Sequence, residues 1–293
     1  MASTKLPLLR FLSKRAFVAK LGCATLCLSA LCCGSPGLFG QTSGNPLVRF
    51  HTDLGDIDVA LLQDVAPANV ANLLGYVNSQ AYNNSFVHRS VPGFIVQGGG
   101  YKFVNNQVAA IPAGSPVVNE FHVSNKRGTL AMAKLGNDPN SATNQWFFNL
   151  VDNSSNLDNQ NGGFTVLGRI INGTGLTTID TIATVPIYNA GSPFDSLPLR
   201  NYVSGNIQDA NLVHVIWIKQ IPQVAALTHP NATTVHVQGK GAPSTAYQLQ
   251  SSAASPASST FTNLVMVTAD ASGNLSYDDT SSGTKKFYRF VIP

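Results

Sequence analysis

The sequence predicts a mainly β protein, with one larger β-rich domain followed by a small all-β domain. Only two segments place apolar residues at helical spacing, and most others read as short alternating strands joined by polar turns. Only 11% of the 293 residues are charged, and glycine is frequent, at 25 residues. The composition shifts after Thr228, which separates the second domain. Few helices and many short strands are typical of a closed barrel or a sandwich.

Residues 1–40 have the layout of a secretory signal peptide. A basic front precedes an apolar run at residues 21–31, and a stretch rich in Gly, Ser and Pro follows. The apolar run is shorter than the roughly 20 residues that span a membrane, so we expect no stable span once the signal is removed. An uncleaved anchor remains the alternative. A lipoprotein site is less favoured, because Cys32 follows Leu31 where such a site needs a small residue. We therefore expect an exported protein, periplasmic or extracellular.

Removal of this leader changes the charge and the cysteine content. The leader holds five of the 18 basic residues and no acidic one, which leaves 13 basic against 14 acidic residues and a net charge of −1. The basic character therefore gives no argument for nucleic-acid binding. All four cysteines also lie in the leader, which excludes disulfides, thiolate nucleophiles and cysteine metal sites from the mature chain.

The first elements of the larger domain follow from local patterns. Residues 48–62 alternate around a Leu54-Gly55-Asp56 turn, which predicts a hairpin. A helix is predicted from Pro67, because apolar residues then recur at i, i+3, i+4 and i+7. A weaker helix is predicted at residues 176–183. Residues 187–205 read as an extended surface loop, and residues 213–221 as the last strand before Pro222 breaks the pattern.

The remaining chain, residues 228–293, predicts five short strands interrupted by a Ser- and Ala-rich stretch at residues 251–260. It is similar to small β modules appended to exported bacterial proteins, with no specific motif. Some seventy residues form a marginal core, so we expect the module to dock on its neighbour or to bind an envelope or extracellular ligand. The predicted strands are residues 234–237, 247–250, 264–267, 275–277 and 287–291.

Residues 86–100 hold the strongest candidate for a site. One cation, Arg89, and one amide, Gln97, lie among the large apolar residues Phe86, Phe94 and Ile95, and three glycines end the segment. Such a segment can hold one arginine above an apolar pocket, which suits an uncharged substrate with a developing lone pair. The alternative is a strand pair with one exposed arginine.

Two further segments, residues 125–149 and 157–169, follow in order. The segment at residues 125–149 runs through Lys-Arg-Gly-Thr-Leu-Ala-Met-Ala-Lys to Asn-Gln-Trp-Phe-Phe-Asn. The segment at residues 157–169 ends in Phe-Thr-Val-Leu-Gly-Arg. Together the three resemble the cyclophilins, the peptidyl-prolyl cis-trans isomerases, and the exported bacterial branch in particular. The resemblance covers residues 46–221 and implies an eight-stranded antiparallel closed barrel capped by two helices. It implies proline-containing polypeptide clients, and the whole chain is expected to be a monomer.

The resemblance also implies roles for individual residues. Arg89 would be the catalytic donor to the prolyl nitrogen, and Gln97 would orient it. His88 precedes the arginine as in the family, and we interpret it as a structural histidine under the site. The residues implied for the proline pocket are Phe94, Ile95, Phe147, Leu157 and Phe164, and those for the neighbouring substrate groove are Ala133, Lys134 and Gln145, with Phe86 also counted as substrate-binding.

Three positions depart from the eukaryotic pattern of the family. Asn156 stands where many members have Trp, Phe164 where many have His, and Lys134 where many have Asn. Exported bacterial members commonly depart at the first two positions, so isomerase activity is still expected. Binding of the drug cyclosporin is expected to be weak.

Other chemistries find little support. The six histidines show no i, i+4 spacing, so no metal site and no cofactor are expected. No nucleophile–base pair suggests a hydrolase. The alternative that stays open is a non-catalytic peptide-binding or cell-surface interaction protein that uses the barrel as a scaffold.

Overall fold

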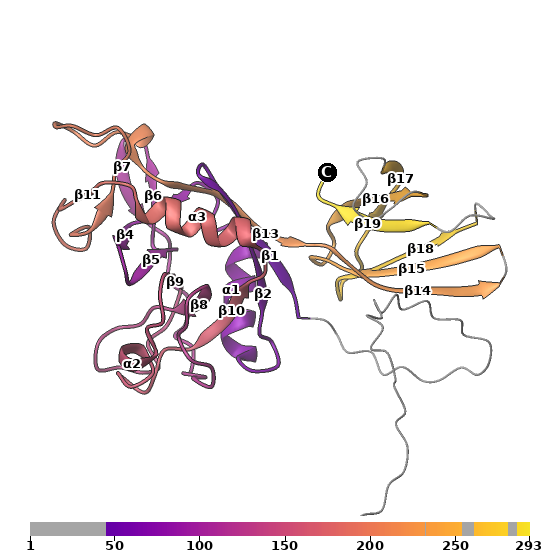
Figure 1. Ribbon diagram of the computed structural model, residues 1–293, viewed down its shortest axis with the longest axis horizontal. Helices are drawn as coiled ribbons and strands as arrows, with labels where there is room; N and C mark the ends of the chain where they lie inside the picture. Colours follow the sequence, from indigo (N-terminus) through magenta and orange to yellow (C-terminus); the bar gives the residue numbers. More distant parts are fainter. Residues whose placement is uncertain (1–44, 232, 254–260, 281–285) are drawn as a thin grey trace, which may run out of the picture. The chain divides into compact units, whose positions relative to one another are not determined.

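The computed structural model describes residues 45–231, 233–253, 261–280 and 286–293 (Figure 1). The predicted signal peptide and most of the Ser- and Ala-rich stretch lie outside these residues. Within them, no helix is both long enough and apolar enough to cross a membrane.

An eleven-stranded sheet dominates the chain up to Ile221 (Figure 1). Its hydrogen-bonded order is β4-β5-β9-β8-β10-β2-β1-β13-β3-β6-β7, and every pairing is antiparallel. The strands are β1 (Leu47–Thr52), β2 (Gly55–Leu61), β3 (Ser85–Phe86), β4 (Arg89–Val91), β5 (Ile95–Gly98), β6 (Tyr101–Val104), β7 (Gln107–Ala110), β8 (Thr129–Met132), β9 (Trp146–Asn149), β10 (Val166–Ile170) and β13 (His214–Ile221).

The strand count differs from the expected eight because single stretches of chain contribute two short strands. Gly99 has φ +84°, which bends the chain out of the extended conformation between β5 and β6. Likewise, Val87 and His88 separate β3 from β4. The fold is thus mainly β, with one long curled sheet, and closure of an eight-stranded barrel is not confirmed.

Both predicted helices are present. They are α1 (Pro67–Asn78) and α3 (Gly173–Ala183), and α3 begins three residues earlier than its apolar pattern indicated. Their apolar faces join the main core, where Leu73 and Ile179 are fully buried with Phe50, Val59 and Leu130. The described residues add a one-turn helix, α2 (Ser154–Leu157), and a 3-10 turn, η1 (Asp209–Asn211). The expectation of two helices therefore missed α2, since four residues are too few for a periodic pattern.

The first turn of α1 is capped from a distant part of the chain. Ala66, the N-cap residue, offers no side-chain hydrogen bond. Instead the Glu120 carboxylate accepts from the backbone N–H of Ala68 at 3.2 Å, from that of Asn69 at 3.0 Å and from the Asn69 side chain at 2.7 Å. Burial alone would raise the pKa of Glu120, but these hydrogen bonds outweigh it and lower the pKa. An anion thus satisfies the free N–H groups at the positive end of the helix dipole.

We expect Glu120→Ala to lower the free energy of unfolding by about 1 kcal/mol, the usual cost of losing a helix cap. Urea denaturation at pH 7 measures this. The matched control is Asp64→Ala, which removes an exposed carboxylate just before the helix that makes no hydrogen bond within the described residues. Equal stabilities of the two variants would contradict the cap.

The segment predicted as a surface loop, residues 187–205, is partly buried. It forms a hairpin of β11 (Ile187–Tyr188) and β12 (Leu197–Pro198). Leu197 and Leu199 are buried in one cluster with Phe86 and Leu212. The sequence pattern concealed this because Pro, Asn and Ser surround only two buried leucines.

The chain after Pro222 forms two three-stranded antiparallel sheets, β14-β15-β18 and β17-β16-β19 (Figure 1). Val237, Tyr247, Leu249, Leu275 and Phe290 are buried in a core of their own. The five predicted strands are present, and a sixth, β14, starts directly after Pro222. Their bounds are β14 (Gln223–Asn231), β15 (Thr234–Lys240), β16 (Ala246–Ser252), β17 (Thr262–Thr268), β18 (Asn274–Asp279) and β19 (Phe287–Val291).

Candidate functional site

The register of three neighbouring strands places the key side chains in one row. Arg89 on β4 pairs with Gln97 on β5, and Gln97 pairs with Phe147 on β9. Residues opposite each other in an antiparallel ladder point to the same face of the sheet. The intervening residues, such as Val96 and Phe148, point to the other face and belong to the main core. The row therefore lies on the face of the sheet opposite that core.

Three polar side chains form a hydrogen-bonded chain along this face. The Arg89 Nη1 donates to Gln97 Oε1 at 3.4 Å, and Gln97 Nε2 donates to Gln145 Oε1 at 2.8 Å. Within the described residues, Arg89 forms no ion pair with a carboxylate. The guanidinium is half-buried and its remaining N–H groups can serve a ligand.

An apolar cup lies next to this polar chain. Its buried residues come from β5, β8, β9, α2 and β10, and its partly buried residues come from the segments that connect the elements. Phe147 meets Phe164 edge to face at 5.9 Å. We define the cup by the buried residues Ile95, Ala131, Phe147, Leu157 and Val166 and the partly buried residues Leu62, Phe94, Val123, Ala133 and Phe164.

The structure thus gathers all five residues predicted for the proline pocket in one cluster. Beside them, Gln97, Ala133, Lys134 and Gln145 line a hollow of about 420 Å³. Phe86 is not part of this arrangement: it is fully buried in the separate cluster under β12. It therefore has no surface to offer a substrate, and its role is in packing.

Sequence reasoning missed a buried network of asparagines that supports the cup. Asn153 Nδ2 donates to the Phe94 backbone oxygen at 2.9 Å and to Asn149 Oδ1 at 2.7 Å. Asn149 in turn donates to Asn125 at 3.2 Å, and Asn125 donates to the Phe164 backbone oxygen at 3.0 Å. The network therefore ties the two aromatic edges of the cup to each other. Nothing local marks these residues, since asparagines also occupy exposed turns, as at Asn105 and Asn106.

His88 lies buried behind Arg89, at 2% exposure, with its ring edge to face with Tyr101 at 5.0 Å. Its Nδ1 atom has no hydrogen-bond partner among the residues that the structure describes. Burial lowers the pKa of His88 to about 4; a hydrogen bond with Gln145 opposes this, and the charge on Arg89 adds to it. The imidazole is therefore neutral at pH 7.

We expect this histidine to make the protein less stable in mild acid. The unfolded chain takes up a proton near pH 6.5 and the folded chain only near pH 4, so the unfolded state binds more protons between these values. The His88 contribution to the free energy of unfolding should fall by about 2 kcal/mol from pH 7 to pH 5. Urea denaturation of the parent protein and of His88→Gln at both pH values measures the His88 contribution. An unchanged pH dependence in that variant would contradict it.

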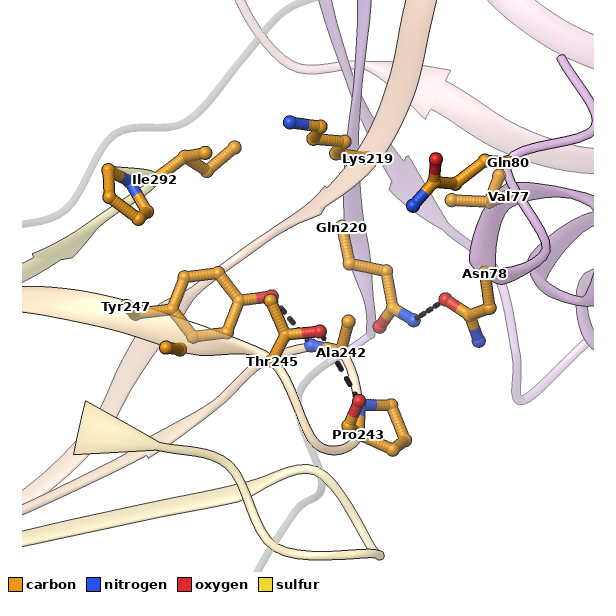
Figure 2. Close-up of a pocket in the computed structure, with 12 residues that line it drawn as sticks. Val77, Asn78, Gln80, Lys219, Gln220, Ala242, Pro243, Thr245, Tyr247 and Ile292 are labelled. Carbon is orange, nitrogen blue, oxygen red and sulfur yellow. Dashed lines mark hydrogen bonds between the residues drawn. The ribbon is translucent and has the colours of Figure 1, made fainter. Parts of the chain in front are cut away.

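A second hollow, of about 350 Å³, lies away from all these residues (Figure 2). Two of the hydrogen bonds at this hollow are dashed in Figure 2. Gln220 Nε2 donates to Asn78 Oδ1 at 2.9 Å, and the Ala242 backbone N–H donates to the Tyr247 hydroxyl at 2.8 Å. No residue predicted for the site lines it. Within the described residues, no three His, Cys, Asp or Glu side chains gather where they could hold a metal ion.

Residues 47–203 match the family model of the cyclophilin type peptidyl-prolyl cis-trans isomerases. Peptidyl-prolyl cis-trans isomerase A of Dickeya dadantii is 36% identical over 194 residues, which are 65% of this chain and 95% of that protein. A peptidyl-prolyl cis-trans isomerase of Acinetobacter baylyi is 37% identical over 150 residues, 50% of this chain and 77% of that one. The solved structure of a Cryptosporidium parvum cyclophilin type isomerase, determined in the presence of the dipeptide Ala-Pro, aligns at a TM-score of 0.44 and 22% identity over 59% of this chain and 96% of that one.

Proposed function

This chain belongs to the cyclophilin-type peptidyl-prolyl cis-trans isomerases, and we propose that it speeds X–Pro bond rotation in exported proteins through Arg89 and the apolar cup. The observation that carries this mechanism is the hydrogen-bonded row Arg89–Gln97–Gln145 beside the cluster that holds Phe94, Phe147 and Phe164. Together they offer a fixed donor and an apolar seat for one five-membered ring.

The reaction needs neither a nucleophile nor a redox group. Rotation about an amide bond costs about 18–20 kcal/mol because the bond has partial double-bond character. For X–Pro bonds both isomers are accessible, but they exchange over tens to hundreds of seconds. In the twisted state the prolyl nitrogen regains its lone pair and becomes a hydrogen-bond acceptor. A donor aimed at that nitrogen stabilises the twisted state more than the planar one, and this difference accelerates the reaction.

Arg89 supplies this donor, and Gln97 holds it in place. Gln97 Oε1 accepts one N–H of the guanidinium, and Gln145 fixes the Gln97 amide from its other end. The guanidinium is thus oriented before the substrate arrives, so little reorganisation is needed in the twisted state. The cup seats the proline ring and keeps water away, and the hollow lined by Gln97, Ala133 and Gln145 receives the residues before proline.

The test is a prolyl isomerisation assay on the purified mature chain. A peptide enriched in the cis X–Pro isomer should convert to trans at a rate that rises in proportion to protein concentration. Refolding of a protein limited by prolyl isomerisation should accelerate in parallel. Peptide binding without acceleration would instead support the non-catalytic scaffold function.

The wider context is also part of the proposal. The mature protein is an exported monomer with its isomerase domain at residues 46–221 and its module at residues 228–293, and the module binds an envelope or extracellular ligand. Sequencing the N-terminus of the secreted protein tests the signal peptide. Cyclosporin binds weakly, because Asn156 offers an exposed amide where many members have Trp; a nanomolar dissociation constant would contradict this.

A further inference from the structure

Lys134 lies two residues after the end of β8 and lines the hollow beside the apolar cup. Its ammonium group is bound by the protein itself. Nζ donates to the backbone oxygen of Asn161 at 2.7 Å and to that of Gly163 at 2.5 Å. It also lies 4.8 Å from the centre of the Phe164 ring, within the range of a cation–π interaction. All three partners belong to one segment, the turn that leads into the aromatic wall of the cup.

This turn has an unusual backbone. Asn161, Gly162 and Gly163 have φ of +51°, +76° and +77°, so three successive residues adopt the left-handed conformation. Two glycines make this possible. Gly163 also packs so closely on Phe121 that an added Cβ would lie 2.3 Å from its ring. The Gly162 carbonyl oxygen accepts from Asn119 Nδ2 at 2.7 Å, and Lys134 supplies the donor to the carbonyl oxygens on either side of it.

A second bond joins the turn to the same segment after β8. Asn161 Nδ2 donates to the Leu135 backbone oxygen at 2.8 Å. In this bond the turn is the donor, whereas in the bonds from Lys134 it is the acceptor. Phe164 is the next residue after the turn, and its backbone N–H donates to the Leu157 backbone oxygen at 3.1 Å. The Phe164 residue thus continues directly from the turn, and hydrogen bonds in both directions join the turn to the segment after β8.

We infer that Lys134 is a positioning residue, which holds the Asn161–Gly163 turn and the Phe164 ring so that the cup fits the proline ring. This inference rests on the proposed function. It differs from the expected role of Lys134 in the substrate groove, because the ammonium donates two of its three N–H groups to carbonyl oxygens of the turn. It also accounts for two departures from the eukaryotic pattern at once, since Lys134 and Phe164 contact each other.

The experiment compares Lys134→Met, which keeps the length of the side chain without its charge, with Lys134→Arg, which keeps the cation. Isomerisation is measured on peptides with Ala, Gln or Glu before proline. For Lys134→Met we expect KM to rise about fivefold on all three peptides, with kcat within about twofold, because a misplaced wall weakens ground-state and twisted-state binding alike. Lys134→Arg should restore most of the KM.

Two controls complete the test. In Phe164→Leu, the further change Lys134→Met should have a smaller effect than in the parent, because the two residues act as a unit. Amide hydrogen exchange at Gly163 and Phe164, whose N–H groups donate to Gln160 and Leu157, should quicken about tenfold in Lys134→Met and stay slow in Lys134→Arg.

Each outcome has one reading. If KM of Lys134→Met rises only for the Glu peptide, the ammonium contacts the substrate. If KM is unchanged and hydrogen exchange stays slow, the turn keeps its conformation without Lys134. Either result overturns the inference. If the parent protein and Arg89→Ala are equally inactive, the proposed function fails. Hydrogen exchange then decides the role of Lys134 by itself.

Discussion

Replacing Arg89 with alanine is expected to lower kcat/KM for prolyl isomerisation by about 10²-fold, the usual effect of removing one preorganised donor. The loss should lie mainly in kcat, because the donor acts on the lone pair that exists only in the twisted state. The apolar cup is left intact, so KM should change little. Progress curves over a range of peptide concentrations separate the two constants.

Two variants make this result specific. Arg89→Lys keeps a positive charge but cannot donate to Gln97 and the substrate in the same planar geometry, so its activity should remain far below that of the parent. Arg169→Ala removes an exposed arginine on β10 and should leave activity unchanged. If Arg89→Ala retained the parent rate while binding peptide normally, the assignment of the donor would be wrong.

Replacing Gly99 with alanine is expected to lower the free energy of unfolding by about 3 kcal/mol. Gly99 has φ +84°, and an added Cβ would lie 2.5 Å from the Asn144 backbone oxygen and 2.7 Å from Trp146 Nε1. Trp146 is 1% exposed and packs edge to face on Phe50, so it has no space to move aside. Urea denaturation measures the change.

Gly93→Ala separates the two causes. Gly93 has a similar φ of +74°, but an added Cβ would meet nothing within 4 Å. Gly93→Ala should lower the free energy of unfolding by only about 1 kcal/mol, which is the effect of the left-handed backbone alone. Equal losses in both variants would mean that Trp146 can yield, and that the close approach of β5 to β9 is not what requires glycine.

Local patterns were enough to predict several elements. The β1–β2 hairpin follows from alternation around the Leu54-Gly55-Asp56 turn, and α1 from Pro67 and the apolar spacing after it. The hairpin and the helix depend on neighbours within a few residues, where side-chain period and turn chemistry act directly. The roles of Arg89, Gln97 and Phe147 were implied instead by the resemblance of three ordered motifs to the cyclophilins.

Other features depend on partners far away in the chain. The cap on α1 comes from Glu120, some fifty residues later, and the Ile187–Tyr188 and Leu197–Pro198 hairpin is buried against Phe86. Phe86 was expected to touch the substrate, and only packing shows that it cannot. Such contacts leave no periodic trace, since either partner alone reads as an ordinary polar or apolar residue.

By itself, then, the sequence determined the β-rich class and the two main helices, and its resemblance to the cyclophilins implied which side chains would carry out the chemistry. Only the tertiary structure decided that Gln145 fixes Gln97, that buried asparagines tie Phe94 to Phe164, and that the Lys134 ammonium faces a turn of its own protein. The physical reason is that a hydrogen bond is directional and short. Its existence therefore depends on how distant strands and loops are brought into register, which no local pattern encodes.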